Sequence, residues 1–491
     1  MANIDGVEID NTQLANALLN EYKSTKQYNE MLDADRYYDV DNVNIGNKTR
    51  TYKDGHGRSI QNLAVSNARL KNAFIRKAVK QKVDYAFGKP PIIKVEPIEK
   101  FEEQTEGESK EQELYQSEWN KFLDASNRKS IKNLAHFAIN CGIGYVYIMI
   151  DNGKLKLVNV PSTSIAPMWT DKTHTELNAL VRSYSDRVFK DGSFQTQNRA
   201  ELWLPDSVSE FDGLTGVTLI GTTDQMENAE GGIKNWNKVP FLWLKGTSDE
   251  KSLLSTVRSY IDEYDNLNSK SVDTLKDDLE AILVMKNYSS ETGKLIDAYI
   301  RLKEIGVCAV DSDGGLSYLK NDPNIASIQT KLEHLKKDIN EFSCTVEIQD
   351  INLGSNPSGV AIKSAFQDTD TYINDVEMEF ELFIENLKYF VDMYLDMSGI
   401  LPKEITSKYE VLATLNRDMM INETEILSNV VKLQGLVSQE TLDDNNPYVE
   451  NHEIEEQRRK QEAENDELFN FKEEEHEIES VETNQPEQVE Q

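Results

Sequence analysis

Histidine and cysteine are the side chains of this sequence that could ligate a metal ion or form a paired-thiol site, and their spacing argues against both roles. No two of the six histidines take the HxxH or HExxH spacing that places two imidazoles on one helix face, and no two of the three cysteines form a CxxC pair. They are His56, His136, His174, His334, His452 and His476, and Cys141, Cys308 and Cys344. We therefore predict no metal site, and we expect the thiols to be buried in a reducing compartment.

Glycine-rich and acidic loops are equally poor candidates for a catalytic or cofactor site. The chain contains no GxxxxGK[ST] string, which would cradle a nucleotide phosphate, and no GxSxG nucleophile elbow. The string from Asp311 to Gly315 begins like an EF-hand, but its sixth and twelfth positions hold Leu316 and Asp322 where calcium needs glycine and glutamate. It therefore predicts a hairpin turn. We predict that the protein is not an enzyme and needs no cofactor; a Ser/His/Asp triad depends on geometry and stays open.

The charge balance limits how this protein can contact nucleic acid. Its 491 residues carry 86 acidic and 53 basic side chains, a formal net charge of -33. Tight duplex binding needs clustered Lys and Arg on the phosphates, so only transient contact is consistent with this balance. Two groups of basic residues have three open interpretations: a solvated helix face, short-lived phosphate contact, or pairing with acidic residues of another subunit. They are Arg69, Lys71, Arg76, Lys77, Lys80 and Lys82, and Lys331, Lys336 and Lys337.

One polar loop leads directly into a very long predicted helix. Residues 350–359 include two glycines and a proline, which disfavour helix, and carry no charge between Ile351 and Ser358. The helix is predicted from Val360 to Asp396 because apolar residues recur at helical spacing, and it would span roughly 55 Å. The loop could be a surface connection or a tip that touches something sliding past it.

The N-terminal half predicts helices first and strands afterwards. Helical spacing covers residues 11–33, 74–85 and 119–140. Asn152-Gly153 predicts the tight turn of a β-hairpin. Strands are expected at residues 92–95, 179–184, 199–204, 217–222 and 239–244. We therefore expect residues 60–245 to be a mixed α+β region, in a chain whose class is α+β and mainly helical.

The C-terminal half predicts two helices that enclose a small α/β knob. The helices are expected at residues 253–280 and 323–342. The knob is expected to have a strand at 281–288, a short helix at 294–304, and a hairpin of 307–310 with 316–319. After the long helix we expect short helices at 410–415 and 423–437, and then a largely disordered acidic tail. No run approaches 18 apolar residues, so we expect no membrane-spanning helix.

Four strings, taken with this order of parts, carry a resemblance to a known family. They are residues 72–74 through 83–90 (NAF to VDYAFGKP), 142–147 (GIGYVY), 260–265 (YIDEYD) and 356–362 (NPSGVAI). The chain resembles the portal protein of tailed bacteriophages, in the family typified by siphophages that infect Gram-positive bacteria. The resemblance covers residues 30–450.

The resemblance implies a ring of twelve identical subunits at one capsid vertex, assembled in the host cytoplasm. Double-stranded DNA is packaged and ejected through such a ring. The implied divisions are an N-terminal segment (1–29), wing (30–245), stem helix (246–282), clip (283–322), returning stem helix (323–345), tunnel loop with long wing helix (346–404), crown (405–447, expected to be helical) and acidic tail (448–491).

The resemblance also implies site residues and partners. The tunnel loop would line the DNA channel through Ile351, Asn352, Leu353, Gly354, Ser355, Asn356 and Pro357. Lys331, Lys336 and Lys337 on the returning stem helix are candidates for brief contact with DNA. Implied partners are the terminase large subunit, a head-completion or adaptor protein, capsid and scaffolding proteins, and double-stranded DNA held transiently; no membrane is implied.

The residues leave a second interpretation open, a non-enzymatic helical scaffold or adaptor protein. Such a protein would need an apolar stripe sustained over three or four heptads. The long helix has sufficient length, but the spacing of its apolar residues drifts as in an ordinary buried helix.

Overall fold

The computed structural model describes a large part of the chain as two compact units. The described residues are 2–4, 7–54, 56–62, 65–98, 106–190, 192–226, 235–277, 282–286, 315–319, 325–347, 359–417, 431–444, 446, 449, 455–456 and 458–460. Unit 1 comprises Met1–Val346 and Asp368–Asp418, and unit 2 comprises Glu347–Gln367 and Met419–Gln491. Each unit is considered by itself.

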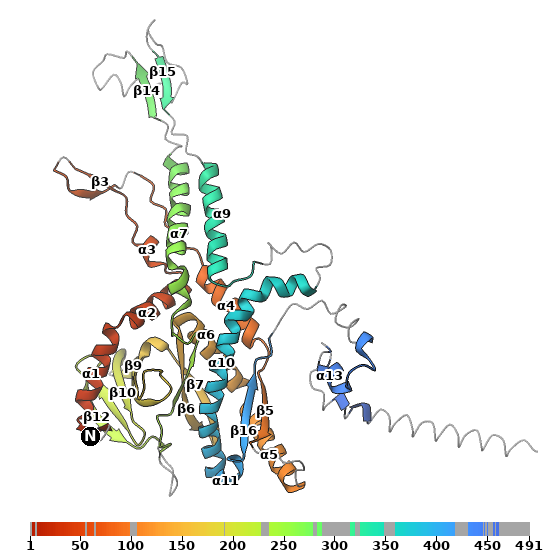
Figure 1. The fold of residues 1–491 in the computed structure, drawn as a ribbon. Coiled ribbons are helices and arrows are strands. Elements are labelled where there is room, and N and C mark those ends of the chain that lie inside the picture. The colour runs from red at the N-terminus through yellow and green to blue at the C-terminus, as the bar shows by residue number, and fades with distance from the viewer. Residues whose placement is uncertain are drawn as a thin grey trace, which may run out of the picture. The chain divides into compact units, whose positions relative to one another are not determined.

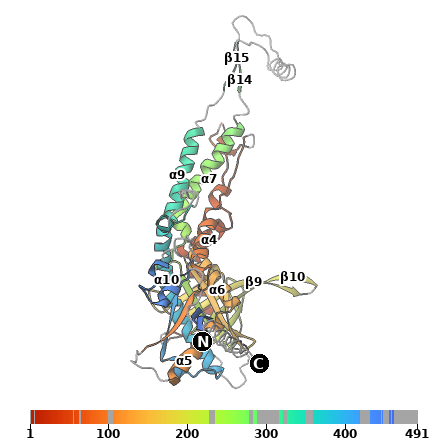
Figure 2. The ribbon, with the colours of Figure 1, turned by 90° about the vertical axis from the view of Figure 1, so that its right-hand side faces the viewer.

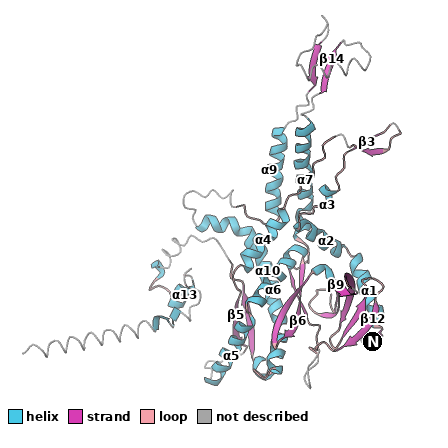
Figure 3. Ribbon diagram, turned by 180° about the vertical axis from the view of Figure 1, so that it is seen from behind, coloured by secondary structure: helices cyan, strands magenta, loops and turns pink. Residues whose placement is uncertain are grey.

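Unit 1 contains a five-stranded antiparallel sheet, and the N-terminal helix α1 covers one of its faces (Figure 3). Its strands run in the order β12-β11-β10-β9-β8. They are β8 (Ile165–Trp169), β9 (Leu177–Lys190), β10 (Ser193–Trp203), β11 (Val208–Asp212) and β12 (Thr218–Thr223). Leu14 and Leu19 of α1 (Asn11–Ser24) pack on Val181, Leu202 and Phe211, all buried. This apolar contact fixes α1 to one face of the sheet.

The predicted helix at residues 11–33 is in fact two helices. The chain turns out of the helical region at Thr25, whose backbone is extended, and α2 (Lys26–Tyr38) then begins. The Thr25 hydroxyl accepts a hydrogen bond from the Tyr28 N–H at 3.2 Å and so caps α2. A two-stranded pair, β1 (Ala2–Ile4) and β2 (Val7–Ile9), precedes α1.

A three-stranded sheet in the order β13-β6-β7 forms the second layer, with helix α6 packed on it. Its strands are β6 (Ile143–Asp151), β7 (Lys154–Val160) and β13 (Phe241–Lys245). The predicted hairpin is confirmed, because Asn152 and Gly153 join β6 to β7 with φ angles of 51° and 73°. A short 3-10 turn, η1 (Ser162–Ser164), leads from β7 into the larger sheet.

The predicted helix at residues 119–140 is also divided. Its first part belongs to α5 (Glu106–Phe122), and α6 (Ala125–Cys141) begins after Asp124. The Asp124 carboxylate accepts a hydrogen bond from the Asn127 N–H at 2.8 Å. An aspartate cap of this kind favours a new helix start over continuation of the preceding one.

Helices α4 (Phe74–Phe87), α7 (Leu253–Asp277) and α9 (Ile325–Phe342) confirm three of the predicted helices. Helices α7 and α9 lie side by side (Figures 1 and 2). In the chain they enclose strands β14 (Ile282–Lys286) and β15 (Gly315–Leu319), which pair antiparallel with each other. The predicted segments 294–304 and 307–310 lie outside the described residues, and the predicted strand at 316–319 has β14 as its partner.

The predicted helix at residues 410–415 is wrong. Residues Tyr409–Thr414 form strand β16, which pairs antiparallel with β5 (Ile92–Pro97). Tyr409 and Ala413 are buried while Glu410 and Leu412 are exposed, the alternation of a strand with one covered face. This part of the implied helical crown is therefore a strand, paired with a strand more than 300 positions earlier.

The remaining described elements include the longest helix. The predicted long helix is confirmed as α10 (Gly359–Met397). The short elements are α3 (Val43–Gly46), β3 (Thr51–Lys53), β4 (Ser59–Gln61), α11 (Lys403–Thr406) and α13 (Gln439–Asp444). The α+β class is confirmed. No helix among the described residues is long and apolar enough to cross a membrane.

Gly246 offers a test of the contact between α6 and the end of β13. A Cβ at Gly246 would overlap the Ala138 carbonyl oxygen and lie 2.9 Å from the carbonyl carbon, both in the backbone of α6. We predict that Gly246→Ala lowers the free energy of unfolding by about 1–3 kcal/mol, because this backbone cannot yield. Gly107→Ala, with nothing within 4 Å of its Cβ, is the control. Equal thermal midpoints for the two variants would contradict the prediction.

Candidate functional site

The strongest candidate site is the base of the polar loop, where both of its flanks meet helix α4. The predicted loop residues Ile351, Asn352, Leu353, Gly354, Ser355, Asn356 and Pro357 lie outside the described residues. The structure describes the flanks: residues 343–346 follow α9, and α10 belongs to unit 1 from Asp368 onward. What holds these flanks decides where the loop starts and ends.

A buried lysine on α4 holds the first flank. Lys82 has no exposed surface, and its Nζ donates hydrogen bonds to the Ser343 carbonyl oxygen and, at 3.0 Å, to the Cys344 carbonyl oxygen. Because α9 ends at Phe342, a cation here also complements the negative end of that helix dipole. The Lys82 ammonium lies 5.2 Å from the centre of the Tyr372 ring on α10. One side chain thus joins α4, the end of α9 and α10.

The buried environment of Lys82 lowers the pKa of its side chain. Burial lowers its pKa from the ordinary value of 10.5 to about 8, because the charged form loses water that the protein replaces only in part. Burial also raises the pKa of the neighbouring Cys344 thiol. Lys82 therefore stays predominantly charged at neutral pH while its pKa is well below that of a solvated lysine.

The next α4 residue towards the N-terminus holds the same flank. The Gln81 side-chain amide donates to the Val346 carbonyl oxygen at 3.0 Å and accepts from the Val346 N–H at 2.9 Å. This pair of bonds satisfies both backbone groups of Val346, as a neighbouring strand would. The Thr369 hydroxyl on α10 donates to the Cys344 carbonyl oxygen at 2.8 Å. The flank is therefore bonded from two sides.

The second flank is held by a tyrosine and an arginine. The Tyr85 hydroxyl on α4 donates to Asp370 of α10 at 2.5 Å, and burial together with this carboxylate raises the pKa of Tyr85. Arg417, after β16, donates to Asp370 at 2.9 Å and pairs with Glu377. Glu377 also accepts from the Leu415 N–H at 2.7 Å. We call Gln81, Lys82 and Tyr85 the α4 anchor.

The sequence contained a signal for Lys82 that its charge obscured. We interpreted the basic residues around α4 as a solvated face, as phosphate contacts or as partners of acidic residues in another subunit, and for the buried Lys82 all three interpretations are wrong. Lys82 occupies the spacing of the buried residues Ile75, Val79 and Ala86, three or four positions apart along one stripe. A lysine within an apolar stripe indicates a buried cation that needs acceptors.

The three candidate lysines, Lys331, Lys336 and Lys337, lie on α9. Lys331 and Lys337 are exposed, and Lys336 is half-buried. Lys331 and Lys337 are six positions apart, which places them about 120° apart around the helix axis. Their contact with DNA stays a prediction.

A second polar cluster attaches residues 66–72 to α7. Asp265, Ser269 and Asp273 recur every four residues and so lie along one face of the helix. They accept hydrogen bonds from the backbone N–H groups of Asn72 (3.2 Å), Leu70 (2.9 Å) and Ala68 (2.6 Å), respectively. Asp273 also pairs with Lys48 at 2.8 Å. This row holds an otherwise irregular segment against the helix.

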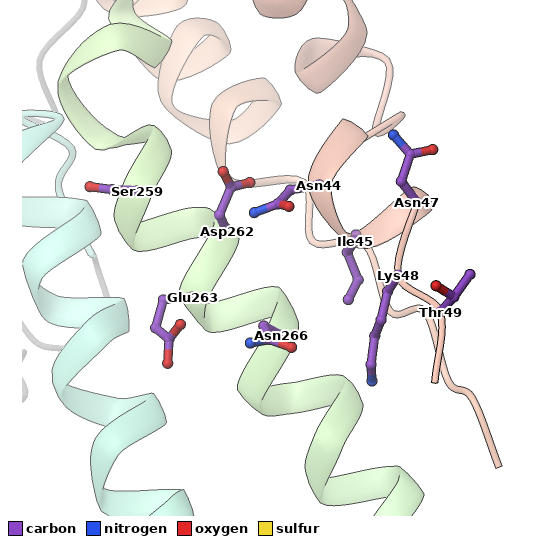
Figure 4. Close-up of a pocket in the computed structure, with 9 residues that line it drawn as sticks. All are labelled: Asn44, Ile45, Asn47, Lys48, Thr49, Ser259, Asp262, Glu263 and Asn266. Atoms are coloured by element: carbon purple, nitrogen blue, oxygen red, sulfur yellow. The ribbon is translucent and has the colours of Figure 1, made fainter. Parts of the chain in front are cut away.

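Close to this row is a pocket of about 520 Å³ between α7 and the α3 segment (Figure 4). Its lining residues are Asn44, Ile45, Asn47, Lys48, Thr49, Ser259, Asp262, Glu263 and Asn266. Ile45 is the one apolar side chain in this lining, whereas small-molecule sites are predominantly apolar. The described residues also contain no group of His, Cys, Asp or Glu that could hold a metal ion. Nothing in the lining of this pocket points to a particular ligand.

Comparison with known proteins gives a match over nearly the whole chain. The family described as "Phage portal protein, SPP1 Gp6-like" matches residues 20–467. The portal protein of Bacillus phage SPP1 is 24% identical over 434 residues, which cover 87% of this chain and 82% of that protein. The match includes α4, both flanks of the loop and the whole of α10.

The α4 anchor predicts an unusual dependence of stability on pH. Between about pH 8 and pH 10.5 the unfolded chain binds more protons at Lys82 than the folded chain, so stability rises with pH in this window. The unfolding free energy of the wild type should therefore increase relative to that of Lys82→Met, by on the order of 2 kcal/mol between pH 8 and pH 10.

Thermal and denaturant unfolding at the two pH values measures this difference. Lys80→Met, which changes an exposed lysine of the same helix, is the matched control and should follow the wild type at both pH values. A difference between wild type and Lys82→Met that does not change with pH would contradict the assignment of a buried, proton-releasing lysine.

Proposed function

Because the chain belongs to the SPP1 Gp6-like family of phage portal proteins, we propose that it forms the ring at a capsid vertex through which double-stranded DNA is packaged and ejected. Portal proteins are structural components of the virion head. The observation that carries the proposal is the family match over residues 20–467, which spans both compact units.

The division of the chain into portal parts is also part of the proposal. We assign residues 30–245 to the wing, 246–282 and 323–345 to the stem, and 283–322 to the clip. Residues 346–404 would be the tunnel loop and long wing helix, 405–447 the crown, and 448–491 an acidic tail. The antiparallel pair of α7 and α9, with β14 and β15 between them in the chain, supports the stem and clip assignments. The crown would begin with a strand, since β16 pairs with β5.

We assign the channel-lining role to residues 351–357. The α4 anchor supports this assignment, because a loop that meets moving DNA needs ends that do not move with it. The segment has no charged side chain. Each lysine or arginine added to a channel wall would release counterions on contact and increase the affinity for DNA. An uncharged constriction in a protein of net charge -33 therefore lets phosphates slide past.

The partners follow from the same proposal. The ring would contain twelve copies, with capsid and scaffolding proteins around it. The clip would bind the terminase large subunit during packaging and a head-completion or adaptor protein afterwards. The absence of a GxxxxGK[ST] string in the sequence supports a separate motor protein, since nucleotide hydrolysis of that type needs such a phosphate loop. Assembly would take place in the host cytoplasm, and Lys331, Lys336 and Lys337 would contact DNA only briefly.

Imaging of the purified protein tests the ring directly. We predict that negative-stain micrographs of the full-length chain contain closed rings with a central hole, because head-to-tail contacts between identical subunits close when the rotation per subunit divides a full turn. Light scattering would give the number of subunits. A protein that stays monomeric across a wide range of concentrations would contradict the proposal.

Changes in the loop test the channel. We predict that deletion of Leu353 to Ser355 leaves rings intact and impairs packaging or retention of DNA, because the α4 anchor lies outside the deletion. Asn352→Lys and Asn356→Lys should slow translocation by adding phosphate contacts. Packaging assays with the deletion and with each lysine variant measure these effects, and Asn352→Gln is the neutral control. Loss of rings in the deletion, or unchanged packaging in the lysine variants, would contradict channel exposure.

A further inference from the structure

Strands β9 and β10 extend far beyond the sheet to which they belong (Figure 2). Strand β8 pairs with β9 only as far as Arg182, and β11 pairs with β10 only from Arg199. One further bond joins Gly213 N–H to the Asn198 carbonyl oxygen at 3.0 Å. Beyond these positions, Asp186–Lys190 and Ser193–Gln197 pair only with each other among the described strands. We call these two segments the ribbon.

The ribbon presents aromatic side chains to solvent. Phe189 and Phe194 lie directly opposite each other, and they are 64% and 66% exposed. Their ring centres are 5.2 Å apart, and the Arg187 guanidinium lies 5.4 Å from the centre of the Phe194 ring. A two-stranded ribbon is marginally stable by itself in water, and exposed aromatic pairs of this kind mark interaction sites.

The aromatic face of the ribbon continues the face of the sheet that α1 covers. Side chains alternate along a strand, so Phe189 shares a face with Val181, and Phe194 shares it with Ala200 and Leu202. These three inner residues are buried against α1. The apolar face of the sheet thus extends beyond the part that α1 covers.

At the edge of the same sheet lies a second uncovered feature, strand β12. It is the last strand of the described sheet, and its Leu219 and Ile220 are 44% and 53% exposed. Residues 213–223 contain no charged side chain and no proline. Natural edge strands normally carry such residues to prevent pairing with another chain, so an edge without them is suited to receive a strand.

We propose that the ribbon of one subunit adds to the β12 edge of the next subunit in the ring. This inference rests on the proposed ring and identifies one contact that joins its members. The two surfaces differ and both belong to every copy, which is what a head-to-tail ring requires. The added strand satisfies the free N–H and C=O groups of both edges, as in other cases of β-strand addition.

The lengths, the charges and the side-chain orientations of the two surfaces all favour a second copy of this chain as the partner of the β12 edge. Five paired residues of the ribbon span roughly 17 Å, and the six of β12 span roughly 20 Å. Asp186, Arg187 and Lys190 give the ribbon a formal charge of +1, and β12 has no charged side chain, so the two can approach without the repulsion expected elsewhere on a chain of net charge -33. Leu219 lies opposite Phe211, on the α1 face, so the added ribbon would place its phenylalanines on the face that carries Leu219.

Cross-linking between subunits tests the contact. The full chain with Phe194→Cys and Leu219→Cys is assembled, checked for rings by negative stain, and treated with a short bis-maleimide. We expect a ladder of covalent multimers on a denaturing gel, because each subunit joins two neighbours. Each single variant, which retains the native cysteines, and the pair Ser59→Cys with Leu219→Cys are controls and should give no ladder.

The outcomes separate this inference from the ring itself. Rings without a ladder would overturn the ribbon contact and leave the portal assignment intact, whereas absence of rings in the wild type would overturn that assignment. A ladder that forms only when capsid protein is added would assign the ribbon to a different partner and also overturn the inference.

A second measurement covers the case in which the cysteines disturb the contact. Phe189→Ser with Phe194→Ser should raise the protein concentration for half-maximal ring assembly at least tenfold, without lowering the thermal midpoint of the monomer. Val188→Ser changes an exposed residue on the opposite face of the same ribbon and is the matched control. Equal assembly by the two variants would contradict the proposal.

Discussion

The position of the polar loop depends on one buried cation, Lys82 of α4. Lys82 joins α4, the end of α9 and α10, three elements that are far apart in the sequence. A buried charge without acceptors would cost several kcal/mol, so the two carbonyl oxygens of residues 343 and 344 must stay where the ammonium can reach them. That constraint fixes the path of the chain where it leaves α9. Gln81 and Tyr85 of the same helix form hydrogen bonds with Val346 and Asp370, respectively.

Unit 1 contains irregular segments that are firmly bonded to helices, and it also contains strands that are free to pair with another chain. Polar side chains on α4 and α7 satisfy the backbone of irregular segments, which a purely apolar core could not do. The ribbon and the edge of β12, by contrast, keep backbone groups and apolar side chains that no other described part of unit 1 covers. A subunit with unpaired backbone groups and exposed apolar side chains on two different surfaces is suited to a closed ring and not to a free monomer.

The sequence predicted the parts of the fold that are governed by local pattern. The spacing along α10, the Asn152-Gly153 turn and the individual helices α7 and α9 were readable because each depends on nearby residues. The helix breaks at Thr25 and Asp124 had a visible capping signal that continuous periodicity concealed. Strand β16 was mistaken for a helix because its partner β5 is distant in sequence. Of the predicted site, the loop lies outside the described residues, and Lys82 was assigned to the surface because charge was given more weight than spacing.

The central claim is that the segment held by the α4 anchor faces DNA inside the portal. The most direct test places a photo-activatable cross-linking side chain at position 355 in DNA-filled particles, with the same side chain at the exposed residue Ser59 as the control. The account predicts covalent attachment of DNA at position 355 and none at position 59. Particles that package DNA normally but give no attachment at position 355 would contradict it.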